Sequence, residues 1–97
     1  MNDYLLLMHA DATSNTTADQ WQPYIASLRE AGAFVGGSSF GAREPIRKNG
    51  ITGTIGASLA GYIHVRAANI GAAKALVPGN PDYESGATVE VVELIRD

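Results

Sequence analysis

The chain of 97 residues is 45% apolar and 18% charged, with a formal net charge of −3 and no cysteine. The length predicts a single domain over residues 1–97, small enough that burial against a partner subunit would add to its stability. The missing cysteines exclude disulfides and thiolate catalysis, and the acidic balance argues against binding to nucleic acid or to a membrane surface. Met1–Asp3 carries no positive side chain of the kind found in secretory signals, so we expect a cytoplasmic protein.

The first part of the chain predicts a strand, a helix and a second strand. Asp3–His9 is a continuous apolar run without helical period, typical of a central strand buried on both faces. Thr17 and Gln20 have the spacing of a capping box, which predicts that a helix begins near them. The apolar stripe of this helix consists of Trp21, Tyr24, Ile25 and Leu28. Gly32 is expected to end the helix, and Ala33–Gly37 is a short second strand.

A glycine-rich segment, Ser38–Leu59, separates the second and third strands. Its clearest local feature is Asn49–Gly50, which is typical of a two-residue hairpin turn. We therefore expect Ile46–Lys48 to fold against Ile51–Thr54 as a small arm.

The rest of the chain predicts a strand, a short helix and a last strand. Leu59–Ala67 alternates polar and apolar residues, and Asn69 is a candidate cap for the helix that follows. The residues of this helix expected to point inward are Ile70, Ala73 and Val77, and Pro78–Gly79 should end it. Asn80–Gly86 is expected to be a loop, and Ala87–Ile95 to be the final strand.

This order of elements is that of an α+β protein, a ferredoxin-like βαββαβ sandwich with an extra small hairpin and with both helices on one face of the sheet. The other face would then expose apolar side chains of the first strand, which a monomer rarely tolerates. We expect a homodimer in which two sheets pack face to face as a dimeric α/β barrel.

Polar residues on this uncovered face are the candidate site. Tyr62, His64 and Arg66 share one side of the third strand. We expect the first and third strands to run side by side and parallel and the last strand to run antiparallel to the first, so that His9, Arg66 and Glu90 meet at one edge of the sheet. In an enclosed seam, His64 or His9 would act as a general base, Arg66 would hold a carboxylate, and Glu90 would pair with them; Tyr62 would line the seam.

Each of these assignments has a plainer alternative. Arg66 and Glu90 can form an exposed ion pair of little energetic consequence, and a one-residue slip of the third strand would turn His64 toward the helices. A His9–Asp11 pair requires the first strand to continue through Asp11. The spacing of histidines and carboxylates matches no metal site, and no cofactor motif is present.

Two further groups extend the candidate site. Arg43, Arg47 and Lys48 lie on the predicted arm, where they either clamp an anionic ligand or form a solvated hairpin, and Arg47 is our ligand-binding candidate among them. Trp21 is expected to belong to the core or to line a cavity, and we include it as a ligand contact. The fold also hosts RNA-recognition modules, but the third strand lacks their stacking aromatics.

Several segments resemble, in order and spacing, the YCII-related (also called DGPF-type) domain family. They are YLLLMHAD at Tyr4–Asp11, LREAGAFVGG at Leu28–Gly37, the Arg47–Gly50 turn, LAGYIHVRAANI at Leu59–Ile70 and GNPDYESGATVEVVEL at Gly79–Leu94. The resemblance implies a bacterial cytoplasmic protein with a dimeric α/β barrel and a largely uncharacterised function. Some relatives are dehydrochlorinase-like or other small-molecule enzymes, so a lyase or isomerase is the alternative to a non-catalytic ligand-binding dimer.

The chain also departs from the family pattern. Trp21 stands where one branch carries a helix histidine proposed to be catalytic, and the aspartate paired with that histidine falls near Asn80. A shift of the comparison by a residue would give this role to Asp82, although the first helix would still supply no histidine. The Asp-Gly-Pro-Phe motif of the other branch is replaced by TGTI at Thr52–Ile55, with only Gly53 in common.

Overall fold

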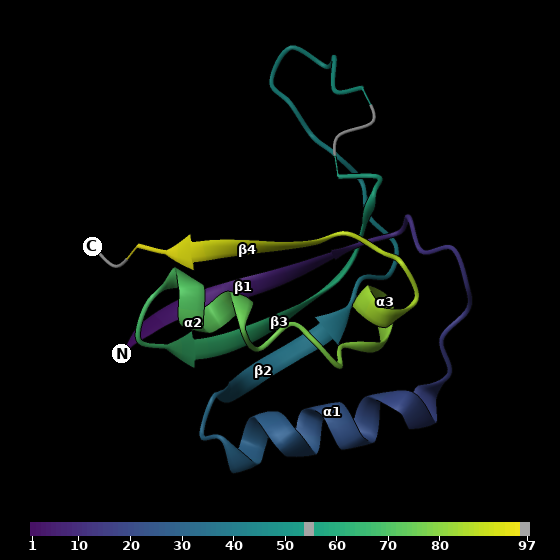
Figure 1. The fold of residues 1–97 in the computed structure, drawn as a ribbon. Helices are drawn as coiled ribbons and strands as arrows, with labels where there is room; N and C mark the ends of the chain where they lie inside the picture. Colours follow the sequence, from purple (N-terminus) through teal and green to yellow (C-terminus); the bar gives the residue numbers. More distant parts are fainter. Residues whose placement is uncertain (54–55, 96–97) are drawn as a thin grey trace.

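Seven elements make up the computed structural model, which describes residues 1–53 and 56–95. They are β1 (Asn2–His9), α1 (Ala18–Glu30), β2 (Phe34–Ser39), β3 (Leu59–Ala67), α2 (Ile70–Lys74), α3 (Pro81–Glu84) and β4 (Val89–Leu94). The four strands form one sheet in the order β2-β3-β1-β4, and every neighbouring pair is antiparallel (Figure 1). This α+β architecture is compatible with a ferredoxin-like fold.

The local sequence signals for α1 are confirmed. The backbone amide of Thr17 donates to the Gln20 side chain at 2.8 Å, so the capping pair is present at the start of the helix. The helix ends at Glu30, and Gly32 adopts a φ of +70°, a conformation that glycine tolerates better than other residues. Tyr24 and Leu28 are buried against the sheet.

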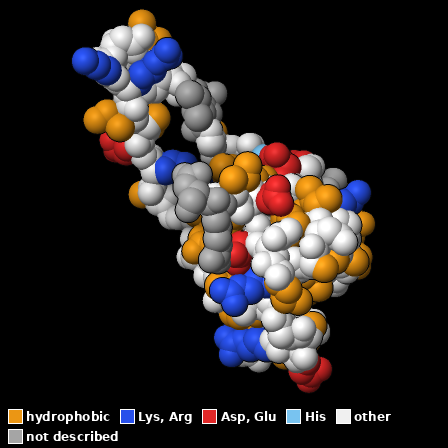
Figure 2. Space-filling view, turned by 90° about the vertical axis from the view of Figure 1, so that its left-hand side faces the viewer, with side chains coloured by type: hydrophobic (Ala, Val, Ile, Leu, Met, Phe, Trp, Pro, Cys, Tyr) orange, Lys and Arg blue, Asp and Glu red, His pale blue; other side chains and the backbone are white. Residues whose placement is uncertain are grey.

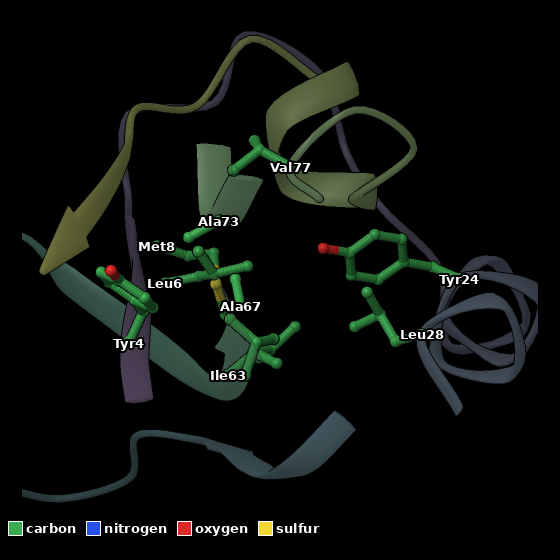
Figure 3. Packing of buried hydrophobic residues seen from close by; sticks show 10 residues of the cluster. Tyr4, Leu6, Met8, Tyr24, Leu28, Ile63, Ala67, Ala73 and Val77 are labelled. Atoms are coloured by element: carbon green, nitrogen blue, oxygen red, sulfur yellow. The ribbon is translucent and has the colours of Figure 1, made fainter. Parts of the chain in front are cut away.

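The core lies between one sheet face and the helices (Figure 3). Tyr4, Leu6 and Met8 point to this face from β1, and Tyr24 and Leu28 reach it from α1. The opposite face of β1 is only half-buried, because the side chains of Leu5, Leu7 and His9 have intermediate exposure. Within a single copy of the chain β1 is therefore fully buried on one face only, and burial of its second face stays a prediction that depends on the expected dimer.

The direction of β3 corrects the predicted sheet. β1 and β3 are antiparallel neighbours, with Asp3 opposite Arg66 and His9 opposite Leu59, whereas the sequence interpretation made them parallel. The physical reason is the path of the chain. β3 also lies beside β2 and runs antiparallel to it, so the chain reverses between these two strands before β3 meets β1.

The region after β3 differs from the prediction in two details. Asn69 caps α2 as expected, since its Oδ1 accepts the Ala72 amide at 2.8 Å, but Ile70 is 51% exposed rather than inward. The α2 helix ends at Lys74, before the predicted Pro78–Gly79 stop.

A four-residue helix, α3, stands where a loop was expected. Asn80 is fully buried, and its Oδ1 accepts the Tyr83 amide at 3.1 Å. Pro81 occupies the first turn, where its missing N–H does not weaken the helix. This cap and proline together explain why a helix forms in a segment that reads as a turn.

The segment between β2 and β3 projects away from the sheet (Figure 1). A turn is present one residue earlier than predicted, because the Gly50 amide donates to the Arg47 carbonyl at 2.9 Å and Lys48 and Asn49 therefore form its centre. The predicted pairing of Ile46–Lys48 with Ile51–Thr54 extends to Thr54, which lies outside the described residues, so the hairpin arm stays a prediction.

Candidate functional site

The sheet directions split the predicted polar edge into two clusters at opposite ends of the uncovered face. His9, at the end of β1, lies near the start of β3 and of β4, whereas Arg66 lies opposite Asp3 at the other end of β1. The prediction that His9, Arg66 and Glu90 share one edge is thus correct for His9 and Glu90 and wrong for Arg66. The expected Arg66–Glu90 ion pair is replaced by two pairs with different partners.

The first cluster joins His9 to Glu90 and Ser58. The His9 Nε2 lies 2.6 Å from the Glu90 Oε1, and the His9 Nδ1 lies 3.1 Å from the Ser58 Oγ. The His9 side chain is 18% exposed and that of Glu90 57% exposed, so the imidazole remains accessible to a ligand. Ser58 belongs to the glycine-rich segment, where no periodic pattern singled it out.

Asp11 does not orient the His9 ring. Its two carboxylate oxygens accept hydrogen bonds from the Thr88 hydroxyl at 2.6 Å and the Thr88 amide at 2.7 Å. These two hydrogen bonds hold the pKa of Asp11 below its ordinary value, and the nearby His9 adds a smaller effect in the same direction. Asp11 therefore fastens the end of β1 to the start of β4, and Glu90 is the carboxylate that contacts His9.

The second cluster is built on Asp3, a residue that the sequence interpretation did not select. Asp3 is 4% exposed, and its Oδ1 lies 2.9 Å from the His64 Nε2 and 3.2 Å from the Arg66 Nε. A buried carboxylate is stable only when cations or donors compensate its lost hydration. His64 and Arg66 fulfil that role, so both side chains are engaged by the protein itself.

The alternation that predicted a polar face on β3 is confirmed. Ile63 and Val65 are buried under the helices, whereas His64 is 25% exposed and Arg66 52% exposed on the opposite side. Tyr62 lies on that same side and stacks on Phe40, with ring centroids 5.8 Å apart and planes 23° apart. A slip that turns His64 inward is therefore excluded.

A pocket of about 270 Å³ opens on the helix side, between α1, the β2–β3 pair and α3. Its apolar residues are Met8, Trp21, Ile25, Phe34, Ala60 and Ile63. Among the described residues of the lining, Asp82 is the only carboxylic acid, and burial raises the pKa of its side chain. An acid in a largely apolar pocket is a physical signature of a binding or catalytic site.

Trp21 and Tyr62 both belong to the lining of this pocket. The sequence predicted a ligand contact of Tyr62 on the uncovered face instead, and ligand binding by either residue stays a prediction. Trp21 packs edge to face on Tyr24, with ring centroids 6.1 Å apart, which ties one wall of the pocket to the core. Gly37 and Gly61 lie where β2 and β3 approach closely, and a side chain on Gly61 would come within 2.8 Å of the Ser38 carbonyl oxygen. The sequence indicated Trp21, but the convergence of three distant segments on Asp82 depends on tertiary structure.

Arg47 joins neither cluster nor the pocket lining among the described residues. Its Nη1 donates to the Ile51 carbonyl at 3.4 Å, across the turn of the projecting segment. Figure 2 shows Lys and Arg side chains at the far end of that segment. Arg47 therefore does not reach the pocket or either cluster of its own chain, and its role as a clamp on an anionic ligand stays a prediction.

Within residues 1–53 and 56–95, no group of three or more His, Cys, Asp or Glu side chains could hold a metal ion. No described helix is long and apolar enough to cross a membrane. Comparison with known proteins adds no assignment: no family model, no curated protein and no solved structure matches the chain.

Proposed function

We propose that the protein is a YCII-related domain that binds a small molecule in the pocket between α1, the β2–β3 pair and α3. The observation that carries this proposal is Asp82, an acid with a raised pKa on the wall of an otherwise mostly apolar pocket. A volume of about 270 Å³ is at the lower end of known ligand pockets, which favours a compact ligand. In the family resemblance the paired aspartate falls near Asn80, and a shift of that comparison would give its role to Asp82.

The lining restricts the chemistry of this ligand. Trp21 and Phe34 offer aromatic surface, so a flat ring fits the apolar part. Asp82 accepts hydrogen bonds when it is ionised, and it favours an amine or hydroxyl over a carboxylate. The arginines that suggested an anionic ligand, Arg66 and Arg47, do not line the pocket. We therefore propose a neutral or cationic aromatic ligand for this pocket.

A fragment panel tests this assignment. The melting temperature of the protein is measured with phenethylamine, tryptamine and phenylacetate, each at several concentrations. Binding of the amines to the folded state should stabilise the protein by about 2.7 kcal/mol at an amine concentration of 100 times Kd, and so raise its melting temperature. Phenylacetate should have little effect. Asp82→Asn should weaken amine binding, and Asp19→Asn, an exposed acid of α1, serves as the matched control. Equal shifts for amines and phenylacetate would contradict the proposal.

We also propose that the uncovered sheet face pairs with a second copy of the chain. Leu5, Leu7 and Val92 lie along this face with intermediate exposure, between the two polar clusters. Burying such apolar side chains against an identical face would stabilise both copies, and a symmetric pair is the commonest arrangement of protein oligomers. Sedimentation velocity over a range of concentrations tests this: a dimer is expected, and a monomer at all concentrations refutes it.

Catalysis by a histidine is the second candidate function, as a lyase, isomerase or dehydrochlorinase-like enzyme. The specific observation that favours it is the His9–Glu90 contact at 2.6 Å, since a carboxylate that holds an imidazole supports its action as a base. His64 makes the same kind of contact, because its Nε2 lies 2.9 Å from the Oδ1 of the buried Asp3, and it is the other candidate base. Chloride release from small chlorinated acids, compared between the wild type and His9→Gln, tests this candidate. Equal rates of chloride release by the wild type and by His9→Gln would refute this candidate function of His9.

A further inference from the structure

Three side chains that are far apart in the sequence meet in series where β1 ends. Ser58 and His9 are separated by 49 positions and His9 and Glu90 by 81, yet the Oγ–Nδ1 and Nε2–Oε1 distances are 3.1 Å and 2.6 Å. We propose that this series is an acyl-transfer centre, in which Ser58 is the nucleophile, His9 the base and Glu90 the positioning acid, and that it acts on small activated esters. The centre is separate from the Asp82 pocket and does not rest on ligand binding there.

The donors and acceptors fix where the protons lie. An ionised Glu90 only accepts hydrogen bonds, so the His9 Nε2 carries the proton of that contact. We therefore assign the neutral His9 ring its unprotonated nitrogen at Nδ1, and the Ser58 hydroxyl donates to it. The carboxylate and the serine contact opposite ring nitrogens, as in a Ser-His-Asp triad, but Nδ1 and Nε2 exchange roles, so that Nδ1 takes the serine proton while Glu90 holds the ring at Nε2.

The segment that carries Ser58 is held on several sides. The Ala10 amide donates to the Ser58 carbonyl at 2.6 Å, which ties the serine to the residue after His9. The Arg43 Nη1 donates to the Gly56 and Leu59 carbonyls, on either side of Ser58. Arg43 therefore fixes the turn that carries Ser58.

The reaction proceeds in two balanced halves. The Ser58 Oγ bonds to the carbonyl carbon of the ester while its proton moves to the His9 Nδ1. The ester C–O bond then breaks, and the leaving alcohol takes that proton. A water molecule next attacks the acyl carbon and gives a proton to the His9 Nδ1. The bond between the carbon and the Ser58 Oγ breaks, Ser58 recovers the proton, and a carboxylic acid is released.

The test uses the full chain and p-nitrophenyl acetate, with nitrophenol release followed by absorbance and the acetylated residue located by peptide mass mapping. The wild type should carry one acetyl group on Ser58. Ser58→Ala should lose the adduct, and His9→Gln should slow its formation by about 100-fold or more. Glu90→Gln should lower kcat with little change in KM, and Glu90→Asp should restore part of it, because Glu90 acts through His9.

Ser14→Ala is the matched control, because Ser14 is an exposed serine in the loop after β1, and it should leave the rate unchanged. A second measurement needs no variant: diisopropyl fluorophosphate should modify Ser58 of the wild type in preference to the other serines. Melting curves establish that each variant is folded. An acetyl group on a lysine or histidine, an unaltered rate in folded Ser58→Ala, or unselective phosphorylation of serines overturns the proposal.

Discussion

Two neighbouring leucines of β1 allow the two sheet faces to be compared directly. Leu6 is fully buried under the helices, whereas Leu7 has intermediate exposure on the uncovered face. Leu6→Ala removes buried methyl groups and leaves a cavity, which costs about 2–5 kcal/mol. A loss of about 3 kcal/mol corresponds to a fall in melting temperature of about 12–24 °C for a chain of this size.

Leu7→Ala should cost less in a monomer, about 1.5 kcal/mol at most, because its side chain is only partly removed from water. If the uncovered face pairs with a second copy, the melting temperature of the wild type should rise with protein concentration, and Leu7→Ala should reduce that rise. Circular dichroism melts at two concentrations separate these effects. Equal losses for the two variants, at both concentrations, would refute the assignment of the core to one face of the sheet.

Two further predictions concern the elements around the pocket. Burial raises the pKa of Asp82 in the native state above its ordinary value of 3.8, so the native state binds a proton more tightly than the unfolded chain. The free energy of unfolding should therefore fall as the pH rises from 3.8 through the raised native pKa. Asp82→Asn should therefore be more stable than the wild type in urea at pH 7 and nearly equal to it at pH 3; equal curves at both pH values contradict this. Asn69→Ala removes the cap of α2 and should cost about 1 kcal/mol, seen as a fall of about 4–8 °C in melting temperature, whereas an unchanged melt would show that the cap contributes nothing.

Much of the fold could be predicted from local sequence signals. The Thr17 and Gln20 pair, Gly32 after α1 and the alternation in Leu59–Ala67 each depend on neighbours in the chain, and each matches the structure. The direction of β3 does not follow from such neighbours, because it depends on how the long segment after β2 returns to the sheet. The error in that direction placed Arg66 at the wrong end of β1.

The candidate site was accessible to sequence reasoning only where a residue type is itself informative. His9 and Glu90 were selected as ionisable residues at strand ends, and they are in contact. Ser58 and Asp3 carry no such pattern, since a serine in a glycine-rich segment and an acid near the start of the chain are common on protein surfaces. Their importance follows from contacts across 49 and 61 positions, which only the folded chain brings together.

The most direct test of ligand binding in the pocket uses the single tryptophan of the chain. Trp21 lines the pocket, so its indole N–H gives one resonance in a ¹⁵N correlation spectrum that reports on this wall alone. Titration with phenethylamine should shift that resonance in a saturable manner, and Asp82→Asn should weaken the titration. A Trp21 resonance that stays in place at millimolar amine would contradict the proposed function.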